Sequence, residues 1–264
     1  MAAVNPVMLA SHRLPDADAV PAGAPATLLD GTSVFFDLDG TLIDIAATPD
    51  GVVVSPDLLA ALDRLVAAAP GRVAVLSGRS LDQLDHLLGR FARRVAVAGS
   101  HGAEIRLAGQ DARQRSAPPA LAAATRALRD VAEAHGLLLE EKSMGTALHY
   151  RHAPGREAIA ASAAAVLADR HGLVLQRGKM MVELRAPGDK GDALCALLRE
   201  EAMVGTRPLF FGDDVTDEDG FVAATRAGGA GVLVGPARAS AARYRLDDPA
   251  AVRRWIDAAT VGAA

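Results

Sequence analysis

The chain has 264 residues, of which 50% are hydrophobic and 23% charged, and it carries a formal net charge of -4. This length and composition allow two modest domains with buried cores. A negative charge and only 3% aromatic residues offer neither a basic footprint nor stacking surfaces, which excludes nucleic acid and anionic membranes as partners. No run approaches the ~18 apolar residues of a membrane span.

The N-terminal residues indicate a cytoplasmic protein. Residues 1–30 are rich in Ala and Pro but lack the charged head and apolar stretch of a secretory signal, so they predict a mobile N-terminal tail on a cytoplasmic protein. The single cysteine, Cys195, cannot form an internal disulfide. Its neighbours Leu194 and Leu197 predict that it is buried on a helix.

Apolar runs and helical patterns alternate from residue 34 onward. They predict strands at 34–36, 73–76 and 95–98, with helices at 56–69 and 81–91 between them. Such alternation predicts a parallel sheet with helices on both faces.

The pattern changes in the middle of the chain and then returns. A helix over 121–135, a hairpin over 137–151, a helix over 157–171 and a hairpin over 173–185 predict a small α+β unit, since strands joined so closely are antiparallel. We expect this unit to span 110–186 and to interrupt an α/β core made of 31–109 and 187–264. The second part of the core shows predicted elements at 192–203 (helix), 208–211 (strand), 218–225 (helix), 231–234 (strand) and after 249 (helix, with Trp255 in the core).

The first strand ends at two carboxylates, Asp37 and Asp39, followed by a Gly-Thr turn. The carboxyl edge of a parallel sheet is where ligands bind, and side chains two residues apart in an extended segment point the same way. Asp37 could therefore attack as a nucleophile while Asp39 protonates a leaving oxygen. The simpler alternative is an ordinary Asp-Gly turn after a strand.

Polar residues also follow two other predicted strands. Ser77 comes after 73–76, and Asp213 and Asp214 come after 208–211, while Lys190 lies in a turn before the next helix. Carboxylates with a hydroxyl and an ammonium group suit a phosphate and Mg²⁺. Turn chemistry alone could explain Ser77 and Lys190.

The rest of the acidic stretch is ambiguous. A capping box from Thr216 to Asp219 would explain its end, whereas the spacing does not match a calcium loop. The pattern leaves open whether Asp214 and Asp217 bind a metal, support its ligands or cap a helix.

In order along the chain, residues 37–41, Ser77, Lys190 and residues 212–214 resemble the four motifs of the haloacid dehalogenase-like (HAD) phosphatases, and 110–186 resembles their cap domain. More narrowly, residues 76–79, 99–104 and 212–219 resemble the trehalose-6-phosphate phosphatases. The resemblance implies a Rossmann-like α/β core with an α+β cap. It also implies that Asp37 is the nucleophile and Asp39 the general acid and base. Ser77 and Lys190 would bind phosphate, and Asp37, Asp39 and Asp213 would hold Mg²⁺.

The resemblance also implies a set of sugar-binding residues: His101, Gly102 and Glu104 in the core, and Lys142, Lys179 and Glu183 on the cap. Without it, His101 would be read as a turn residue, and the cap residues as the polar face of a half-exposed sheet.

Together these observations predict a Mg²⁺-dependent phosphatase that converts trehalose 6-phosphate to trehalose and phosphate through an aspartyl-phosphate. Its partner would be a small sugar phosphate, and a monomer is favoured. Two alternatives stay open: a related phosphatase acting on sucrose phosphate or on glucosyl- or mannosyl-glycerate phosphate, and a phosphoaccepting receiver switch. Asp39 and the inserted unit count against the switch.

Overall fold

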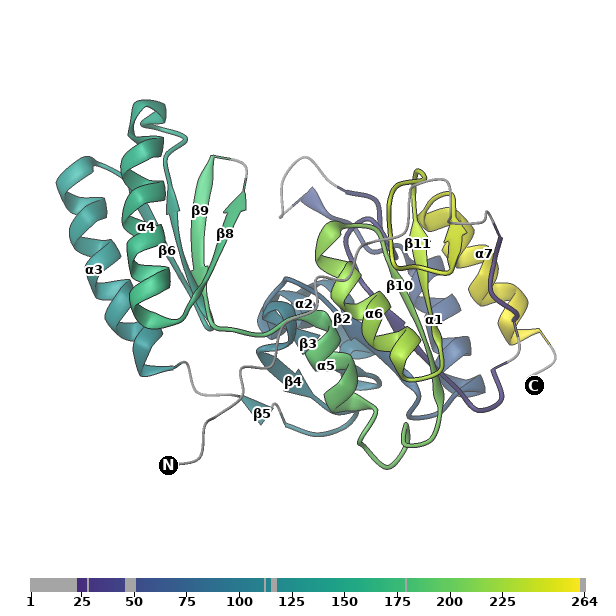
Figure 1. Ribbon diagram of the computed structural model, residues 1–264. Coiled ribbons are helices and arrows are strands. Elements are labelled where there is room, and N and C mark those ends of the chain that lie inside the picture. Colours follow the sequence, from purple (N-terminus) through teal and green to yellow (C-terminus); the bar gives the residue numbers. More distant parts are fainter. Residues whose placement is uncertain are drawn as a thin grey trace, which may run out of the picture.

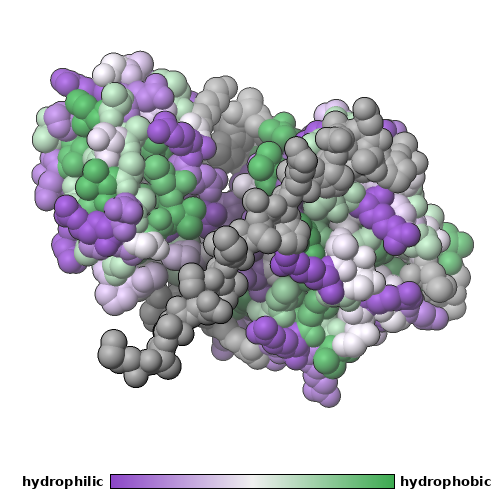
Figure 2. Space-filling view, viewed as in Figure 1, coloured by the Kyte–Doolittle hydropathy of each residue, from purple (hydrophilic) through white to green (hydrophobic). Residues whose placement is uncertain are grey.

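The computed structural model describes residues 23–27, 29–45, 51–111, 113, 114, 118–178 and 180–261, except for the side chains of residues 113 and 114. The chain forms two units, each built on its own sheet (Figure 1). The larger sheet has the order β12-β11-β10-β1-β2-β3-β4-β5, and the smaller has the order β6-β7-β9-β8. In the space-filling view the molecule has two lobes (Figure 2).

The strands of the larger sheet are β1 (Thr32–Phe36), β2 (Val73–Leu76), β3 (Ala96–Gly99), β4 (Glu104–Arg106), β5 (Arg113–Gln114), β10 (Arg207–Gly212), β11 (Ala230–Val234) and β12 (Tyr244–Leu246). Its helices are α1 (Pro56–Ala68), α2 (Leu81–Leu88), α5 (Lys190–Leu197), α6 (Glu218–Arg226) and α7 (Pro249–Thr260), with short 3₁₀ segments η3 (Gly89–Arg93), η4 (Ser100–Gly102) and η6 (Val215–Asp217). All pairings from β12 through β3 are parallel, whereas β4 and β5 pair antiparallel at one edge.

Helices cover both faces of this sheet, as the sequence predicted. Phe36 and Phe211 point to the face that packs against α1, α2 and α7, where Trp255 lies in the core. Phe35 and Phe210 point to the opposite face, which α5 and α6 cover. Because neighbouring side chains in a strand alternate between faces, a continuous apolar run is what a doubly covered strand requires.

The smaller unit, called the cap below, contains β6 (Leu138–Lys142), β7 (Gly145–His149), β8 (Val174–Gly178), β9 (Met181–Arg185), α3 (Pro119–His135), α4 (Glu157–His171) and η5 (Pro154–Arg156). Helices α3 and α4 pack on the sheet face that carries Leu148, Val182 and Leu184. The other face of the cap sheet is turned toward the core (Figure 1).

A small apolar cluster joins the two units. Met144, in the turn between β6 and β7, is buried with Ala103 of the core and with Ala186, which follows β9. The Ala186 amide donates to the Met144 carbonyl at 2.9 Å. This cluster fixes one end of the cap sheet beside the core loop that carries His101.

Several elements differ from the sequence prediction. Strands β4, β5 and β12 were not expected, and β5 joins the larger sheet although it falls within the range 110–186 assigned to the inserted unit. Helix α5 begins at Lys190 and ends at Leu197, because the amides of Arg199, Glu200 and Met203 donate to carbonyls three residues earlier and not four. Cys195 is exposed, not buried, since the inward face of α5 carries Ala193, Leu194 and Leu197.

Part of the predicted tail contacts the core. Leu29 is buried, and the Pro25 carbonyl accepts a hydrogen bond of 3.2 Å from Trp255 Nε1. Residues 1–22 lie outside the described residues. Among the described residues, no helix combines the length and hydrophobicity that a bilayer span requires.

Candidate active site

Three neighbouring parallel strands end at one edge of the larger sheet, and each is followed by a polar residue. Asp37 follows β1, Ser77 follows β2 on one side, and Asp213 follows β10 on the other. Asp37 and Ser77 are both buried. The parallel register therefore brings together side chains that are far apart in the sequence.

Asp37 is held by a buried ammonium group. Lys190 Nζ lies 2.6 Å from Asp37 Oδ1 and 2.6 Å from Asp217 Oδ1, and all three side chains are less than a tenth exposed. Lys190 is the first residue of α5, whose N-cap Asp189 accepts from the Asp192 amide at 2.8 Å. The start of that helix thus places the cation against the end of β1.

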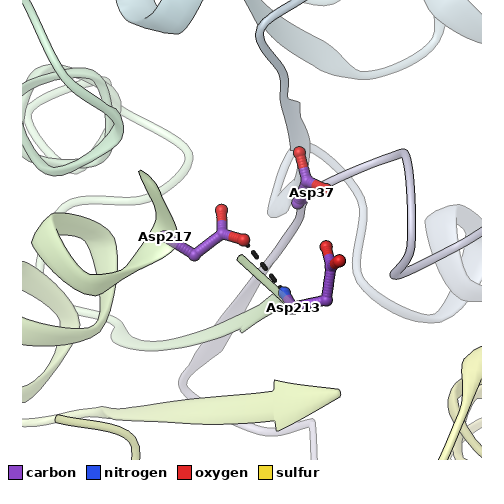
Figure 3. A group of neighbouring side chains, drawn as sticks. All are labelled: Asp37, Asp213 and Asp217. Carbon is purple, nitrogen blue, oxygen red and sulfur yellow. Dashed lines mark hydrogen bonds between the residues drawn. The ribbon is translucent and has the colours of Figure 1, made fainter. Parts of the chain in front are cut away.

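The carboxylates of Asp37, Asp213 and Asp217 converge, as Figure 3 shows, with one oxygen from each within 4.8 Å of the others. Asp217 Oδ2 accepts from the amides of Asp213 and Asp214, both at 2.9 Å. Thr41 Oγ1 donates to Asp213 Oδ1 at 3.3 Å. A Cβ on Gly40, whose φ is +88°, would lie 2.1 Å from Asp213 Oδ2, so only glycine leaves room for that carboxylate.

Two of these carboxylates have raised pKa values. Burial raises the pKa of Asp37 to about 8, with Lys190 opposing the rise and Asp217 and Asp213 adding to it. Burial, followed by Asp217, raises the pKa of Asp213 to about 6. Burial lowers the pKa of Lys190, but Asp37 and Asp217 outweigh burial and raise it.

The donor set fits a hard divalent cation. Carboxylate oxygens in a compact group are the ligands that Mg²⁺ takes in proteins, and an added cation would offset the excess negative charge. The Asp213 carboxylate of this group occupies the space in which a Cβ on Gly40 would lie.

Asp39, which was predicted to hold the metal together with Asp37 and Asp213, has its carboxylate outside this cluster. Its two oxygens accept from Arg79 Nε and Nη2, both at 2.7 Å. The Asp39 side chain is one-third exposed. The third carboxylate of the cluster is that of Asp217, which the sequence had left undecided.

The loop that follows β3 carries His101 in a strained conformation. Ser100, His101 and Gly102 have φ values of +49°, +55° and +92°, which are costly for residues with a side chain. The His101 ring lies over Gly78, where a Cβ would come within 2.8 Å of it. Burial lowers the pKa of His101 to about 4, and Arg185, Lys190 and Lys142 lower it further while Asp214 raises it.

Glu104 supports this loop from beneath. It is buried, and its Oε2 accepts from Ser100 Oγ at 2.7 Å and from the Leu81 amide at 3.3 Å. Gly102 packs on the Ala193 methyl of α5 and on the carbonyl of Asp189, the N-cap of that helix. The structure therefore places these two predicted sugar-binding residues behind the loop, not on its open side.

A pocket lies between the open side of the loop and the cap sheet. Gly78, Ser80, Gln83 and His101 line it from the core, and Lys142, Glu183 and Arg185 from the cap. Lys142 Nζ donates to Glu183 Oε2 at 2.7 Å. Three predicted residues, His101, Lys142 and Glu183, thus meet at one pocket, while Lys179 lies outside the described residues.

Sequence reasoning missed Arg79 and Arg185 and misplaced one helix cap. The Arg185 guanidinium donates to Gln176 Oε1 at 3.1 Å and to the Gly188 carbonyl at 2.6 Å. The capping box joins Asp214 and Asp217, not Thr216 and Asp219. The recurrence of acids at 213, 214 and 217 was the available signal, because a carboxylate three residues beyond an N-cap reaches back to its amide.

Comparisons with known proteins agree with this geometry. A sequence model of the trehalose-phosphatase family matches residues 35–250. The chain is 39% identical over 230 residues to the trehalose-6-phosphate phosphatase of Escherichia coli, covering 86% of this chain and 85% of that protein. It is 35% identical over 269 residues to the trehalose-phosphate phosphatase of Mycobacterium tuberculosis, covering 93% of this chain and 65% of that protein.

The fold agrees as well. The structure of Aspergillus fumigatus trehalose-6-phosphate phosphatase superposes with a TM-score of 0.69 at 26% identity, covering 92% of this chain and 99% of that one. A phosphatase of the haloalkanoate (HAD) superfamily from Bacteroides thetaiotaomicron shares the fold, with a TM-score of 0.60. The chain therefore belongs to the trehalose-phosphatase family.

Proposed function

We propose that this protein hydrolyses trehalose 6-phosphate to trehalose and inorganic phosphate, as a step of trehalose biosynthesis. The observation that carries the proposal is the buried Asp37 carboxylate, held by Lys190 at the ligand-binding edge of the sheet in a chain of this family. We further propose that it acts in the cytoplasm as a monomer.

Asp37 is the nucleophile in this proposal. Lys190 binds Oδ1, which leaves the other carboxylate oxygen to form a bond to phosphorus while the bond from phosphorus to the sugar oxygen breaks. Asp39 gives a proton to the departing sugar oxygen. It then removes one from the water that attacks the aspartyl-phosphate, and this step releases phosphate and restores Asp37.

The other polar groups at this edge hold the phosphate and a cation. Ser77 would donate its hydroxyl, and Lys190 its charge, to phosphate oxygens. We propose Mg²⁺ at the carboxylate cluster, with Asp37 and Asp213 as ligands; Asp39 would join them by leaving Arg79. When bound, Mg²⁺ would offset the charge that phosphate and carboxylates share.

The cap selects the sugar in this proposal. The phosphate chemistry is the same for every monoester, so discrimination has to come from groups that meet the rest of the substrate. His101, Lys142 and Glu183 line the pocket next to the phosphate site, and the second glucose of trehalose 6-phosphate would bind there.

A phosphate-release assay with Mg²⁺ over a panel of sugar phosphates tests the proposal. We expect kcat/KM for trehalose 6-phosphate to exceed the values for sucrose phosphate, glucosyl- and mannosyl-glycerate phosphate and glucose 6-phosphate. A higher value for one of these would reassign the substrate. Retention of a phosphoryl group without turnover would favour the receiver switch instead.

A further inference from the structure

The loop that carries Asp213 and Asp214 is bound from a second side by an arginine that belongs to none of the motifs discussed above. Arg238 lies in the segment between β11 and β12, and its Nη2 donates to the Asp214 carbonyl at 2.8 Å and to the Asp213 carbonyl at 3.2 Å. We propose that Arg238 is a positioning residue that sets the affinity of the carboxylate cluster for a divalent cation. The inference rests on the proposed function for the identity of that cluster as a metal site.

The loop formed by Asp213 and Asp214, called the acid loop below, has a carboxylate on one side and a guanidinium group on the other. Its amide hydrogens point to the Asp217 carboxylate, at 2.9 Å from both residues. Its carbonyl oxygens point to the Arg238 guanidinium. The peptide group between Asp213 and Asp214 is therefore held from both sides by charge-assisted hydrogen bonds, and its orientation fixes the backbone position from which the Asp213 side chain extends.

Arg238 is itself held in place. Its Nη1 donates to Glu218 Oε1 and, at 3.1 Å, to the Ala239 carbonyl. Glu218 is buried, and its Oε2 accepts from the Ala241 amide at 2.7 Å and from Ser240 Oγ at 3.2 Å. The segment after β11 is thus tied to the first turn of α6, with Arg238 between them.

This arrangement needs an arginine and not merely a positive charge. Two nitrogens of one planar group reach four acceptors from three different segments. A lysine would bring a single nitrogen on a flexible stem, which cannot reach the same acceptors in a fixed geometry. Arg238→Lys therefore separates the effect of charge from the effect of geometry.

A small displacement of the acid loop should weaken metal binding, because the Asp213 carboxylate is closely confined. The Asp213 carboxylate occupies the space that a Cβ on Gly40 would take and accepts from Thr41 Oγ1. Residues that orient metal ligands through hydrogen bonds typically alter metal affinity roughly tenfold to a hundredfold when they are removed.

The test measures Mg²⁺ binding directly on the purified full chain by isothermal titration calorimetry, for wild type, Arg238→Gln and Arg238→Lys. Arg64→Gln is the matched control, because Arg64 pairs with Asp257 at 2.6 Å on the exposed surface between α1 and α7. We expect both Arg238 variants to bind Mg²⁺ roughly ten times more weakly than wild type, and the control to be unchanged.

Two further readouts distinguish positioning from simple loss of structure. The urea midpoint in EDTA should fall in Arg238→Gln, which leaves the buried Glu218 without its cation, but should stay close to that of Arg64→Gln in Arg238→Lys, which keeps a cation there. In both variants kcat at saturating Mg²⁺ should stay near the wild-type value. Unchanged Mg²⁺ affinity in both variants would overturn the proposal, as would tighter binding in Arg238→Gln alone, which would show that only charge matters. If Arg238→Gln does not fold, Arg238→Lys decides by the same criteria. Because binding is read without substrate, failure of the proposed function would leave this result intact.

Discussion

Arg79 donates two parallel hydrogen bonds to Asp39, from Nε to Oδ2 and from Nη2 to Oδ1, both at 2.7 Å. Both oxygens of the proposed general acid are therefore bonded to Arg79 and lie outside the carboxylate cluster. To reach a leaving oxygen, Asp39 has to exchange at least one of these bonds.

The role of Asp39 can be separated from that of Asp37 by the leaving group. Asp39→Asn keeps one acceptor for Arg79 but cannot donate a proton as an acid. We expect a much larger loss of kcat for trehalose 6-phosphate than for p-nitrophenyl phosphate, whose leaving group needs little protonation. Steady-state kinetics on both substrates decide, and equal losses would count against the acid role.

Asp37→Asn should abolish turnover without disturbing the fold. The amide oxygen can still accept from Lys190, but it has neither the charge nor the nucleophilicity to attack phosphorus. The check is a phosphate-release assay, with circular dichroism as the control for folding. Activity within tenfold of wild type would contradict the mechanism, since tenfold corresponds to only about 1.4 kcal/mol of barrier.

The two acids of the β10 loop should respond differently to substitution. Activity should disappear in EDTA and return with Mg²⁺, and Asp213→Asn should raise the Mg²⁺ concentration needed. It should cost little stability, because the Asp213 carboxylate accepts from Thr41 Oγ1 whereas Lys190 pairs with Asp37 and Asp217. Asp217→Asn removes a partner of the buried Lys190 and should lower the free energy of unfolding by roughly 3 to 5 kcal/mol. Urea unfolding with and without Mg²⁺ measures both effects, and equal destabilisation by the two substitutions would contradict this assignment.

Glu183→Ala tests whether the cap selects the sugar. Loss of a hydrogen bond to a charged group should lower kcat/KM for trehalose 6-phosphate about tenfold or more, at ~1.5 to 3 kcal/mol, and leave p-nitrophenyl phosphate nearly unchanged. Glu133→Ala, on the exposed side of α3, is the control. A parallel fall on both substrates would show that Glu183 maintains the cap structure, and no fall would make it a solvated surface charge.

His101 should give the protein a measurable dependence of stability on pH. Its folded-state pKa of about 4 is below the ordinary value of 6.5, so between these values the unfolded chain takes up a proton that the folded protein does not. Stability from this residue is present above pH 6.5 and is lost as pH falls through that window, by roughly 2 kcal/mol between pH 7 and pH 5. His101→Asn tolerates the positive φ and should remove that part of the pH dependence. Urea midpoints at the two pH values measure it, and identical slopes for the two proteins would contradict the prediction.

The sequence revealed those parts of the fold that depend on local pattern. The Val-Phe-Phe run of β1 and its neighbours predicted a doubly covered parallel sheet, and Asp37, Ser77 and Asp213 were identified because each follows such a run. Strand β4 was missed because Glu104 and Arg106 are polar. Their burial depends on hydrogen bonds to other segments, among them those of Glu104 with Ser100 and of Arg106 with Asp85.

The site residues that escaped prediction depend on contacts between distant segments. Arg79 is recognisable only once Asp39, 40 positions away, is placed beside it. Glu104 was expected to face substrate, but it lies beneath the loop because of the turn at Ser100 and His101. The positive φ values of these two residues could not be predicted from the residue pattern. Local sequence identifies which groups can do chemistry, whereas the pairing of strands and loops decides which of them meet.

The contacts of Asp213 with Gly40 and Thr41 have a consequence for the order in which the protein folds and becomes active. Thr41 and Asp213 are 172 residues apart, and the whole cap is synthesised between them. A nascent chain that has completed β1 to β3 and the cap still lacks β10, so its nucleophile has neither its neighbouring strand nor its acidic partners. Closing so long a loop carries a large entropic penalty before any contact across it forms. We therefore expect phosphatase activity to be the last property that a refolding chain regains, after the helical signal of the cap has returned.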